Sequence, residues 1–197
     1  MQTLAGPSMN AVWQEFDVST ASRIGGLHQR PCILWFTGLS GAGKTTTANL
    51  LEGRLRGDGR RTVILDGDIL RQGLNRDLGF TDADRVENMR RTAEVARLFA
   101  DTGHVVIVAL ISPFRKERAM AREIAGSVPF YEVYFDAPLA TCEERDPKGL
   151  YRRARCGEIA NFTGIGSVYE PPFAPELRVD SGSLSVDDAV GRIIALL

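Results

Sequence analysis

Short apolar runs alternate with longer amphipathic segments along most of the chain. Five runs are rich in Val, Ile, Leu, Phe or Tyr and are bounded by Gly, Pro, Asp or Ser: Cys32–Phe36, Thr62–Leu65, Val105–Ile111, Phe130–Phe135 and Leu177–Val179. Each has the length and composition of a β-strand. The run VVIVALI has no polar alternation, which is typical of a strand buried on both faces.

Helical spacing of apolar residues fills the intervals between these runs. The predicted helices are Lys44–Arg56, Ala83–Asp101, Phe114–Ala125, Leu139–Glu144, Pro147–Cys156 and Val186–Leu197. In the second, an apolar stripe recurs every three or four residues, at Val86, Met89, Ala93, Ala96 and Ala100. Asp146 followed by Pro147 predicts the start of the fifth helix, and Gly157 predicts its end.

Strands that alternate with helices predict an α/β fold. We expect a three-layer sandwich, with a central parallel sheet covered by helices on both faces and with ligands bound beyond the carboxyl ends of the strands. Residues 1–30 are polar and rich in Gly and Ser apart from an aromatic patch at Trp13 and Phe16. They are predicted to be an N-terminal arm that packs locally, ahead of one domain at residues 31–197.

Composition narrows the class of protein. The chain has 197 residues, of which 44% are hydrophobic and 25% charged, as expected for one globular domain. Its 24 basic and 25 acidic residues give a net charge of −1, which argues against nucleic-acid binding. The cysteines Cys32, Cys142 and Cys156 are odd in number and irregularly spaced, which indicates reduced thiols rather than a disulfide framework or zinc site.

Hydropathy along the chain bears on its location. No apolar run approaches the ~20 residues of a membrane span, and no basic segment followed by an apolar block opens the sequence. We therefore expect a cytoplasmic protein that binds no membrane.

The strongest chemical signal is a phosphate-binding loop. The segment GLSGAGKT at residues 38–45 matches G-x-x-x-x-G-K-[ST], follows a predicted strand and opens a predicted helix. Its backbone N–H groups can surround a phosphate, Lys44 can reach the outer phosphates, and the Thr45 hydroxyl can ligate Mg²⁺. The residues expected to bind ATP are Gly38, Leu39, Ser40, Gly41, Ala42, Gly43, Lys44, Thr45 and Thr46.

Two acids follow the second predicted strand. Asp66 and Asp68 lie in LDGD, on the edge of the sheet that carries the phosphate loop. They can hold Mg²⁺ or accept a proton from an alcohol, although either could instead cap the next helix. The base-reading motif N-K-x-D of GTPases is absent from the sequence, and the apolar strand Val105–Ile111 ends in Ser112 rather than an acid.

Several blocks together resemble the adenylylsulfate kinase family over roughly residues 10–197. They are NAVW at 10–13, WFTGLSGAGKTT at 35–46, LDGD at 65–68, RQGLNRDLGF at 71–80, DADRVEN at 82–88, ISPF at 111–114, DPKGLY at 146–151 and NFTGI at 161–165. The sequence departs from the usual family pattern at Gln14, Ile69, Gln72 and Phe114. The resemblance implies Mg²⁺-dependent transfer of the ATP γ-phosphoryl group to the 3′-hydroxyl of adenosine 5′-phosphosulfate (APS), which gives 3′-phosphoadenylyl sulfate (PAPS).

The resemblance also implies a substrate site and catalytic residues. The residues implied for APS binding are Asp66, Asp68, Arg71, Asn75, Phe80, Arg85, Asn88, Ile111, Ser112, Lys148, Leu150 and Phe162. Cations suit the phosphosulfate, and the two phenylalanines can stack on a purine. The catalytic candidates are Lys44, Asp66 as base or metal-side organiser, and Ser112. The family serine matching Ser112 has been described as a phosphoserine intermediate, but a serine with no adjacent base is a weak nucleophile, so a positioning role is expected.

The sequence also indicates a lid, and the resemblance indicates partners. Residues 146–166 carry Arg152, Arg153 and Arg155 between glycines, and we expect them to form a lid over the phosphates. The family is commonly dimeric and is also found fused to a sulfurylase, so a homodimer is expected and association with ATP sulfurylase is allowed. Two alternatives stay open: a related kinase with a nucleoside or sugar acceptor, and a nucleotide-gated regulatory subunit, against which Asp66, Asp68 and Lys148 argue.

Overall fold

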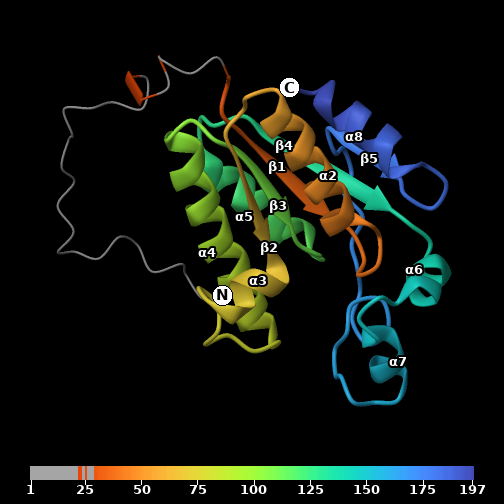
Figure 1. The fold of residues 1–197 in the computed structure, drawn as a ribbon. Coiled ribbons are helices and arrows are strands. Elements are labelled where there is room, and N and C mark those ends of the chain that lie inside the picture. The colour runs from red at the N-terminus through yellow and green to blue at the C-terminus, as the bar shows by residue number, and fades with distance from the viewer. Residues whose placement is uncertain (1–21, 24, 26–28) are drawn as a thin grey trace, which may run out of the picture.

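The computed structural model describes residues 22, 23, 25 and 29–197. Its strands are β1 (Cys32–Thr37), β2 (Thr62–Asp66), β3 (Val105–Ala109), β4 (Phe130–Asp136) and β5 (Leu177–Asp180). They form one parallel sheet in the order β2-β3-β1-β4-β5 (Figure 1). All five predicted strands are confirmed. The strand β3 is fully buried, and it ends two residues before the predicted Ile111.

Helices cover both faces of this sheet. One layer holds α2 (Lys44–Gly57) and α8 (Val186–Ile194), and the other holds α4 (Asp82–Asp101) and α5 (Arg115–Ala125) (Figure 1). Residues alternate along β1, because Ile33 and Trp35 pack with the α4 stripe while Leu34 and Phe36 pack with α2 and α8. The predicted three-layer sandwich is confirmed.

One helix is not predicted by the sequence, and two predicted helices have a boundary that differs by three residues; the other helix boundaries agree within one residue. The six-residue helix α3 (Gly67–Gln72) is absent from the predicted set. The helix α7 (Leu150–Arg155) starts three residues later than Pro147, because residues 147–149 form a turn in which Gly149 N donates to Asp146 O. Its N-cap is therefore Gly149, so the predicted Asp146 cap is wrong, although the Asp146 carboxylate accepts from two N–H groups of that helix. The helix α8 ends at Ile194, short of the predicted Leu197.

A small lobe extends beyond the carboxyl edge of the sheet. It contains α6 (Leu139–Arg145), α7 and the following loop, which includes the segment predicted as a lid (Figure 1). The Tyr151 hydroxyl donates to Ser40 O over 3.0 Å, and its ring meets Phe162 edge-on at 5.0 Å between centroids. The lobe therefore packs directly on the phosphate loop.

The predicted arm is described only in part, and Trp13 and Phe16 lie outside the described residues. At its end, Gln29 Nε2 donates to Arg61 O over 3.0 Å, and Arg61 N donates to Gln29 Oε1 over 2.7 Å. Among the helices described, none is long and apolar enough to cross a membrane.

Candidate active site

The phosphate loop joins β1 to α2 and owes its shape to glycine. Gly38 has φ 145° and Gly43 has φ 93°, values that side chains of L-residues rarely allow. A Cβ on Gly38 would also lie 2.5 Å from Phe135 O. Gly43 caps α2 without a side-chain hydrogen bond, so the N–H groups of the first turn face the loop. This arrangement is suited to bind an anion.

The only lysine of this loop is buried within it. Lys44 Nζ donates to Gly38 O over 2.8 Å and to Leu39 O over 2.7 Å. Burial lowers the pKa of Lys44 to about 8. Its ammonium group is therefore held by loop carbonyls that phosphate oxygens can replace.

The Asp66 carboxylate is bonded at both oxygens. Thr45 Oγ1 donates to Oδ2 over 2.8 Å, and Asp68 N donates to Oδ1 over 2.9 Å. Asp66 thus caps α3 and also contacts the phosphate loop. Its role as a helix cap therefore does not exclude a role beside the phosphates. A hydroxyl and a carboxylate in contact supply the hard oxygen atoms that Mg²⁺ prefers, and Mg²⁺ commonly takes few protein ligands beside phosphates and water. These residues fit the metal that the sequence implies.

A cavity of about 1600 Å³ runs from the phosphate loop to the lobe. This volume exceeds the 300–1,000 Å³ range of a site for one drug-sized ligand, so two nucleotides can fit. The predicted site residues that line it are Ser40, Gly41, Ala42, Gly43, Lys44, Thr45, Thr46, Asp66, Asp68, Arg71, Phe80, Arg85, Asn88, Ile111, Ser112, Lys148, Leu150 and Phe162. Gly38, Leu39 and Asn75 are not among its lining residues.

Two of the predicted acceptor-site residues that line the cavity are phenylalanines. Phe80 is 62% exposed, and the Arg71 guanidinium carbon lies 4.3 Å from its ring centroid. Phe162 is 9% exposed and packs into the core through Tyr151. Phe162 is therefore both a cavity wall and a core residue, whereas Phe80 is free to meet a ligand.

Arg85 connects α4 to the lobe. Its Nη1 donates to Thr163 Oγ1 over 3.1 Å, its Nη2 donates to Asn161 O, and its Nε donates to Phe80 O over 3.2 Å. The Arg85 side chain thus lies between the two segments that carry the phenylalanines.

The two asparagines of the predicted site differ in position. Asn88 lines the cavity, while Asn75 is fully buried behind it and donates from Nδ2 to Asn88 Oδ1 over 2.9 Å. The structure therefore places Asn75 where it can orient Asn88.

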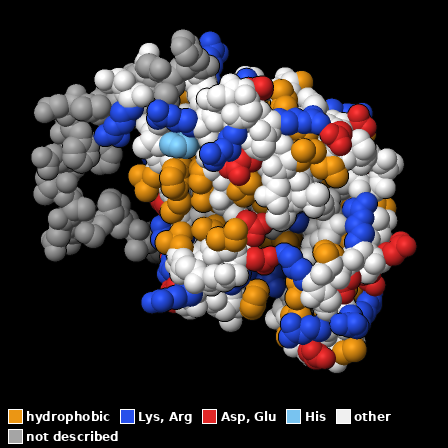
Figure 2. Space-filling model, in the orientation of Figure 1, with side chains coloured by type: hydrophobic (Ala, Val, Ile, Leu, Met, Phe, Trp, Pro, Cys, Tyr) orange, Lys and Arg blue, Asp and Glu red, His pale blue; other side chains and the backbone are white. Residues whose placement is uncertain are grey.

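Charged residues of the lobe reach the cavity rim. Lys148 forms an ion pair with Asp68, and both are residues predicted to bind the substrate. Arg153 lines the cavity and pairs with Glu158 at 3.0 Å, while Arg155 pairs with Glu143 outside it. Figure 2 shows basic side chains gathered over this lobe.

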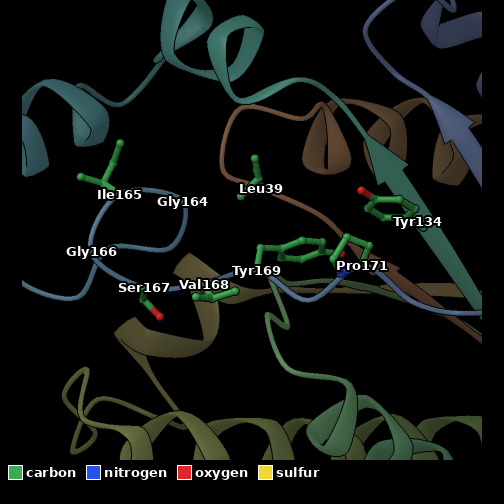
Figure 3. A pocket seen from close by; sticks show the side chains of 9 residues that line it. All are labelled: Leu39, Tyr134, Gly164, Ile165, Gly166, Ser167, Val168, Tyr169 and Pro171. Carbon is green, nitrogen blue, oxygen red and sulfur yellow. The ribbon is translucent and has the colours of Figure 1, made fainter.

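A second, shallower hollow lies beside the lobe. Figure 3 shows Leu39 of the phosphate loop on one side of it and the turn at residues 164–167 on the other. Tyr134 and Tyr169 line it with their rings stacked at 5.9 Å, and the Tyr169 hydroxyl lies 2.9 Å from Thr37 Oγ1. Its lining residues include no Asp, Glu, Lys or Arg, so it lacks the charges that phosphoryl transfer requires.

Ser112 occupies a strained turn after β3. Its φ is 48° and it is 2% exposed. Trp35 Nε1 donates to Ser112 Oγ over 3.0 Å, while Thr37 Oγ1 and Arg118 Nη1 donate to its carbonyl oxygen. The hydroxyl therefore accepts a hydrogen bond from the indole, and among the described residues no base is seen to accept a hydrogen bond from it.

Comparison with known proteins shows to which family the chain belongs. The sequence model of the adenylylsulphate kinase family matches residues 30–180. The chain belongs to this family. It is 54% identical to the adenylyl-sulfate kinase of Marinobacter nauticus over 95% of this chain and 94% of that one. Its function is that of an adenylyl-sulfate kinase.

Two further members of the family are informative. The chain is 57% identical, over 93% of its length, to the bifunctional enzyme NodQ of a Rhizobium species, and it spans 28% of that protein. A solved structure of the Mycobacterium tuberculosis APS kinase CysC, in complex with AMPPNP and APS, is 51% identical. That structure matches with a TM-score of 0.81 over 85% of this chain and 97% of the other.

Among the cavity-lining residues that the sequence predictions do not name, two bear directly on the charge of the site. Arg145 lines the cavity and donates to Gly41 O over 3.3 Å, and its place beside DPKGLY could have indicated it. Glu117 lines the cavity and is 2% exposed, and burial raises its pKa to about 7. Within the charged segment RKER, it has the pattern of a solvated residue, so the sequence carries no signal for it.

Proposed function

We propose that this cavity transfers the γ-phosphoryl group of ATP directly to the 3′-hydroxyl of APS, giving ADP and PAPS. The observation that supports this most strongly is the position of Asp66. It accepts a hydrogen bond from Thr45 of the phosphate loop and lines the same cavity as the aromatic and cationic residues of the predicted acceptor site. A donor and an acceptor bound at the two ends would therefore meet beside its carboxylate.

On the donor side, the loop from Gly38 to Thr46 binds the phosphates of ATP. Lys44 exchanges its two carbonyl partners for phosphate oxygens and places its charge where negative charge develops. Thr45 and water would hold Mg²⁺, with Asp66 beside them, and the ion would neutralise charge on the β- and γ-phosphates.

On the acceptor side, cationic side chains bind the phosphosulfate and aromatic side chains bind the purine. Arg71 and Lys148 attract the phosphosulfate, for which Lys148 gives up its ion pair with Asp68. Phe80 and Phe162 hold the purine between them. The remaining acceptor contacts come from Asp68, Arg85, Asn88 with Asn75 behind it, Leu150, and the backbone of Ile111 and Ser112.

In the transfer step, the acceptor O3′ bonds to the γ-phosphorus as the bond from that phosphorus to the β–γ bridging oxygen breaks. Asp66 orients the 3′-hydroxyl and takes its proton late in the step. Ser112 positions the acceptor without forming a covalent bond, because no adjacent base among the described residues would activate its hydroxyl.

The larger assembly follows from the family. We infer that residues 146–166 act as a lid, that the protein is a homodimer, and that it works in the cytoplasm. Association with ATP sulfurylase rests on the family resemblance alone.

Coupled ADP release across a set of acceptors tests the proposal. We expect turnover with APS, and none above the acceptor-free background with nucleosides or sugar acids. Turnover with a nucleoside or sugar would favour the related-kinase alternative. Tight binding of ATP and APS without ADP release would favour a regulatory subunit.

A further inference from the structure

The turn after β3 presents its backbone to the cavity in a conformation that needs support. Ile111, Ser112 and Pro113 line the cavity, and Ser112 has φ 48°, a value that residues other than glycine rarely adopt. Such a conformation persists only where the surrounding structure holds it. The proposed function assigns the backbone of Ile111 and Ser112 to the acceptor, so the group that holds this turn also aims the atoms that meet APS.

The amide group of Ser112 is available to a ligand. Ile111 O accepts from Gly38 N over 3.3 Å and from Thr37 Oγ1 over 2.8 Å, so this carbonyl points toward the end of β1. In a trans peptide the N–H points the opposite way, so the Ser112 N–H points away from β1. Among the described residues, none accepts a hydrogen bond from it. A free donor on a residue that lines the cavity is suited to bind an acceptor atom of a substrate.

The donors around Ser112 differ in what they can fix. The Trp35 indole bonds to the Ser112 hydroxyl and leaves the backbone unbound. Thr37 Oγ1 lies 3.2 Å from Ser112 O, but its single proton serves the shorter bond to Ile111 O. Arg118 Nη1 donates to Ser112 O over 2.6 Å. Arg118 is therefore the principal donor to the carbonyl group that ends this turn.

Arg118 is itself held firmly in place. It is 3% exposed, its Nε donates to Glu132 Oε1 over 2.5 Å, and its Nη2 donates to Glu170 O over 2.8 Å. Glu170 N donates in turn to Pro113 O over 2.8 Å. The guanidinium thus joins β4, the turn and the segment that leaves the lobe. Its planar fork of N–H groups makes these bonds at once, which a lysine ammonium group cannot repeat.

We propose that Arg118 is a positioning residue for the acceptor: its bond to Ser112 O holds the strained turn so that the backbone of Ile111 and Ser112 meets APS. The proposal rests on the proposed function and adds to it the group that shapes this part of the acceptor site. Arg118 is not among the residues that line the cavity, so it acts through the turn. Its loss weakens the use of APS and leaves ATP binding intact.

The first test is Arg118→Met, which removes the donors and keeps an apolar side chain of similar length. We expect kcat/KM for APS to fall about 10- to 100-fold, the scale of a displaced binding group, with a higher KM for APS and an unchanged KM for ATP. Arg122→Met is the matched control. Arg122 lies on the same helix and also bonds a carbonyl oxygen and a glutamate, Phe130 O and Glu176 Oε2, but it has no bond to the turn. Whatever its effect on the melting temperature, the control should keep the wild-type KM for APS.

Substitutions at Ser112 separate positioning from a general loss of stability. Ser112→Gly and Ser112→Ala both remove the hydroxyl, but only glycine adopts φ 48° without strain. In the Arg118→Met background, kcat/KM for APS should therefore be about fivefold or more higher with glycine than with alanine. With Arg118 present the two should differ less, because its hydrogen bond imposes the conformation on both.

Three results would overturn the proposal: an equal rise in KM for both nucleotides, an unchanged KM for APS in folded Arg118→Met, or a glycine variant no better than the alanine variant. If Arg118→Met does not fold, Arg118→Lys replaces it, because lysine keeps the charge beside Glu132 without the fork. The glycine and alanine pair then decides in that background. If the wild-type protein fails to use APS at all, the proposed function fails instead.

Discussion

At the scale of single residues, the side chains proposed to take part in the reaction are held by hydrogen bonds within the protein. Asp66 is fixed by Thr45 and by the backbone of α3, Lys44 by two loop carbonyls, and Ser112 by Trp35. Positioned groups need little reorganisation when charge develops on the phosphoryl group, which is the main source of electrostatic catalysis. Each group can therefore be tested by a substitution that keeps its shape.

Asp66→Asn should slow the chemical step while leaving the fold intact. Asparagine can still cap α3, so the melting temperature should change little. The single-turnover rate should fall about 10²-fold or more, because the proton acceptor is lost. Recovery of the rate at raised Mg²⁺ would instead assign Asp66 to metal organisation, and a wild-type rate would refute its catalytic role.

Phe80→Ala and Phe162→Ala should weaken APS binding much more than ATP binding, by about 1–3 kcal/mol. The two variants should differ in stability, because Phe80 is 62% exposed and Phe162 is 9% exposed within the core. We expect Phe162→Ala to cost about 3–5 kcal/mol of unfolding free energy and Phe80→Ala less than 1 kcal/mol. Titration calorimetry with each nucleotide and thermal melts measure both effects. Equal weakening of both nucleotides would contradict a stacking role.

Glu117→Gln should stabilise the protein at neutral pH and above. The pKa of this carboxyl is about 7 in the folded protein and 4.5 in its ordinary state, so the folded state binds more protons between these values. Stability therefore falls as pH rises through this window, and the cost is complete above pH 7. Melts at pH 8 should show a gain on the order of 1–3 kcal/mol that shrinks near pH 5. A gain independent of pH would contradict this explanation.

At the scale of elements, the sequence predicts the strands and helices that have periodic apolar residues, and it misses the features that depend on single local hydrogen bonds. All five strands and the long helices follow from apolar periodicity, because burial decides them. The short helix α3 depends on capping by Asp66, and the late start of α7 depends on a turn at residues 147–149. Such choices arise from single hydrogen bonds that apolar periodicity does not record.

The candidate site likewise contains residues that the sequence predicts and residues that it does not. The phosphate loop could be predicted because its backbone geometry demands glycine at fixed spacing. The position of Asn75 behind Asn88, and the burial of Glu117, depend on how α4 and α5 pack against the sheet. Those contacts join residues distant in sequence, so residue type alone does not indicate them.

The N-terminus of α4 offers a test at this scale. Thr81 and Asp84 form a reciprocal capping box at the start of the helix that carries Arg85. Thr81→Ala should cost about 1 kcal/mol, or roughly 2–4 °C in melting temperature, with kcat unchanged. Thr81→Ser keeps the cap and should restore the loss. A stable Thr81→Ala variant would show that packing alone holds this end of α4.

At the scale of the whole molecule, the cavity lies between the sandwich and the lobe. Arg85 ties α4 to Thr163, Lys148 pairs with Asp68, and Tyr151 bonds to Ser40 of the phosphate loop. Donor and acceptor sites thus share one wall that belongs to the lobe. Under the proposed function, this wall opens to admit both nucleotides and closes to exclude water that would otherwise hydrolyse ATP.

The most direct test follows the label of γ-³²P-ATP through a single turnover with APS. The account predicts that label passes to PAPS without appearing on the protein, that ADP forms only with APS, and that Lys44→Ala slows transfer about 10²–10³-fold while remaining folded. Label on Ser112 before it reaches PAPS would contradict direct transfer. ADP release without PAPS, or a normal rate in Lys44→Ala, would contradict the assignment of the cavity itself.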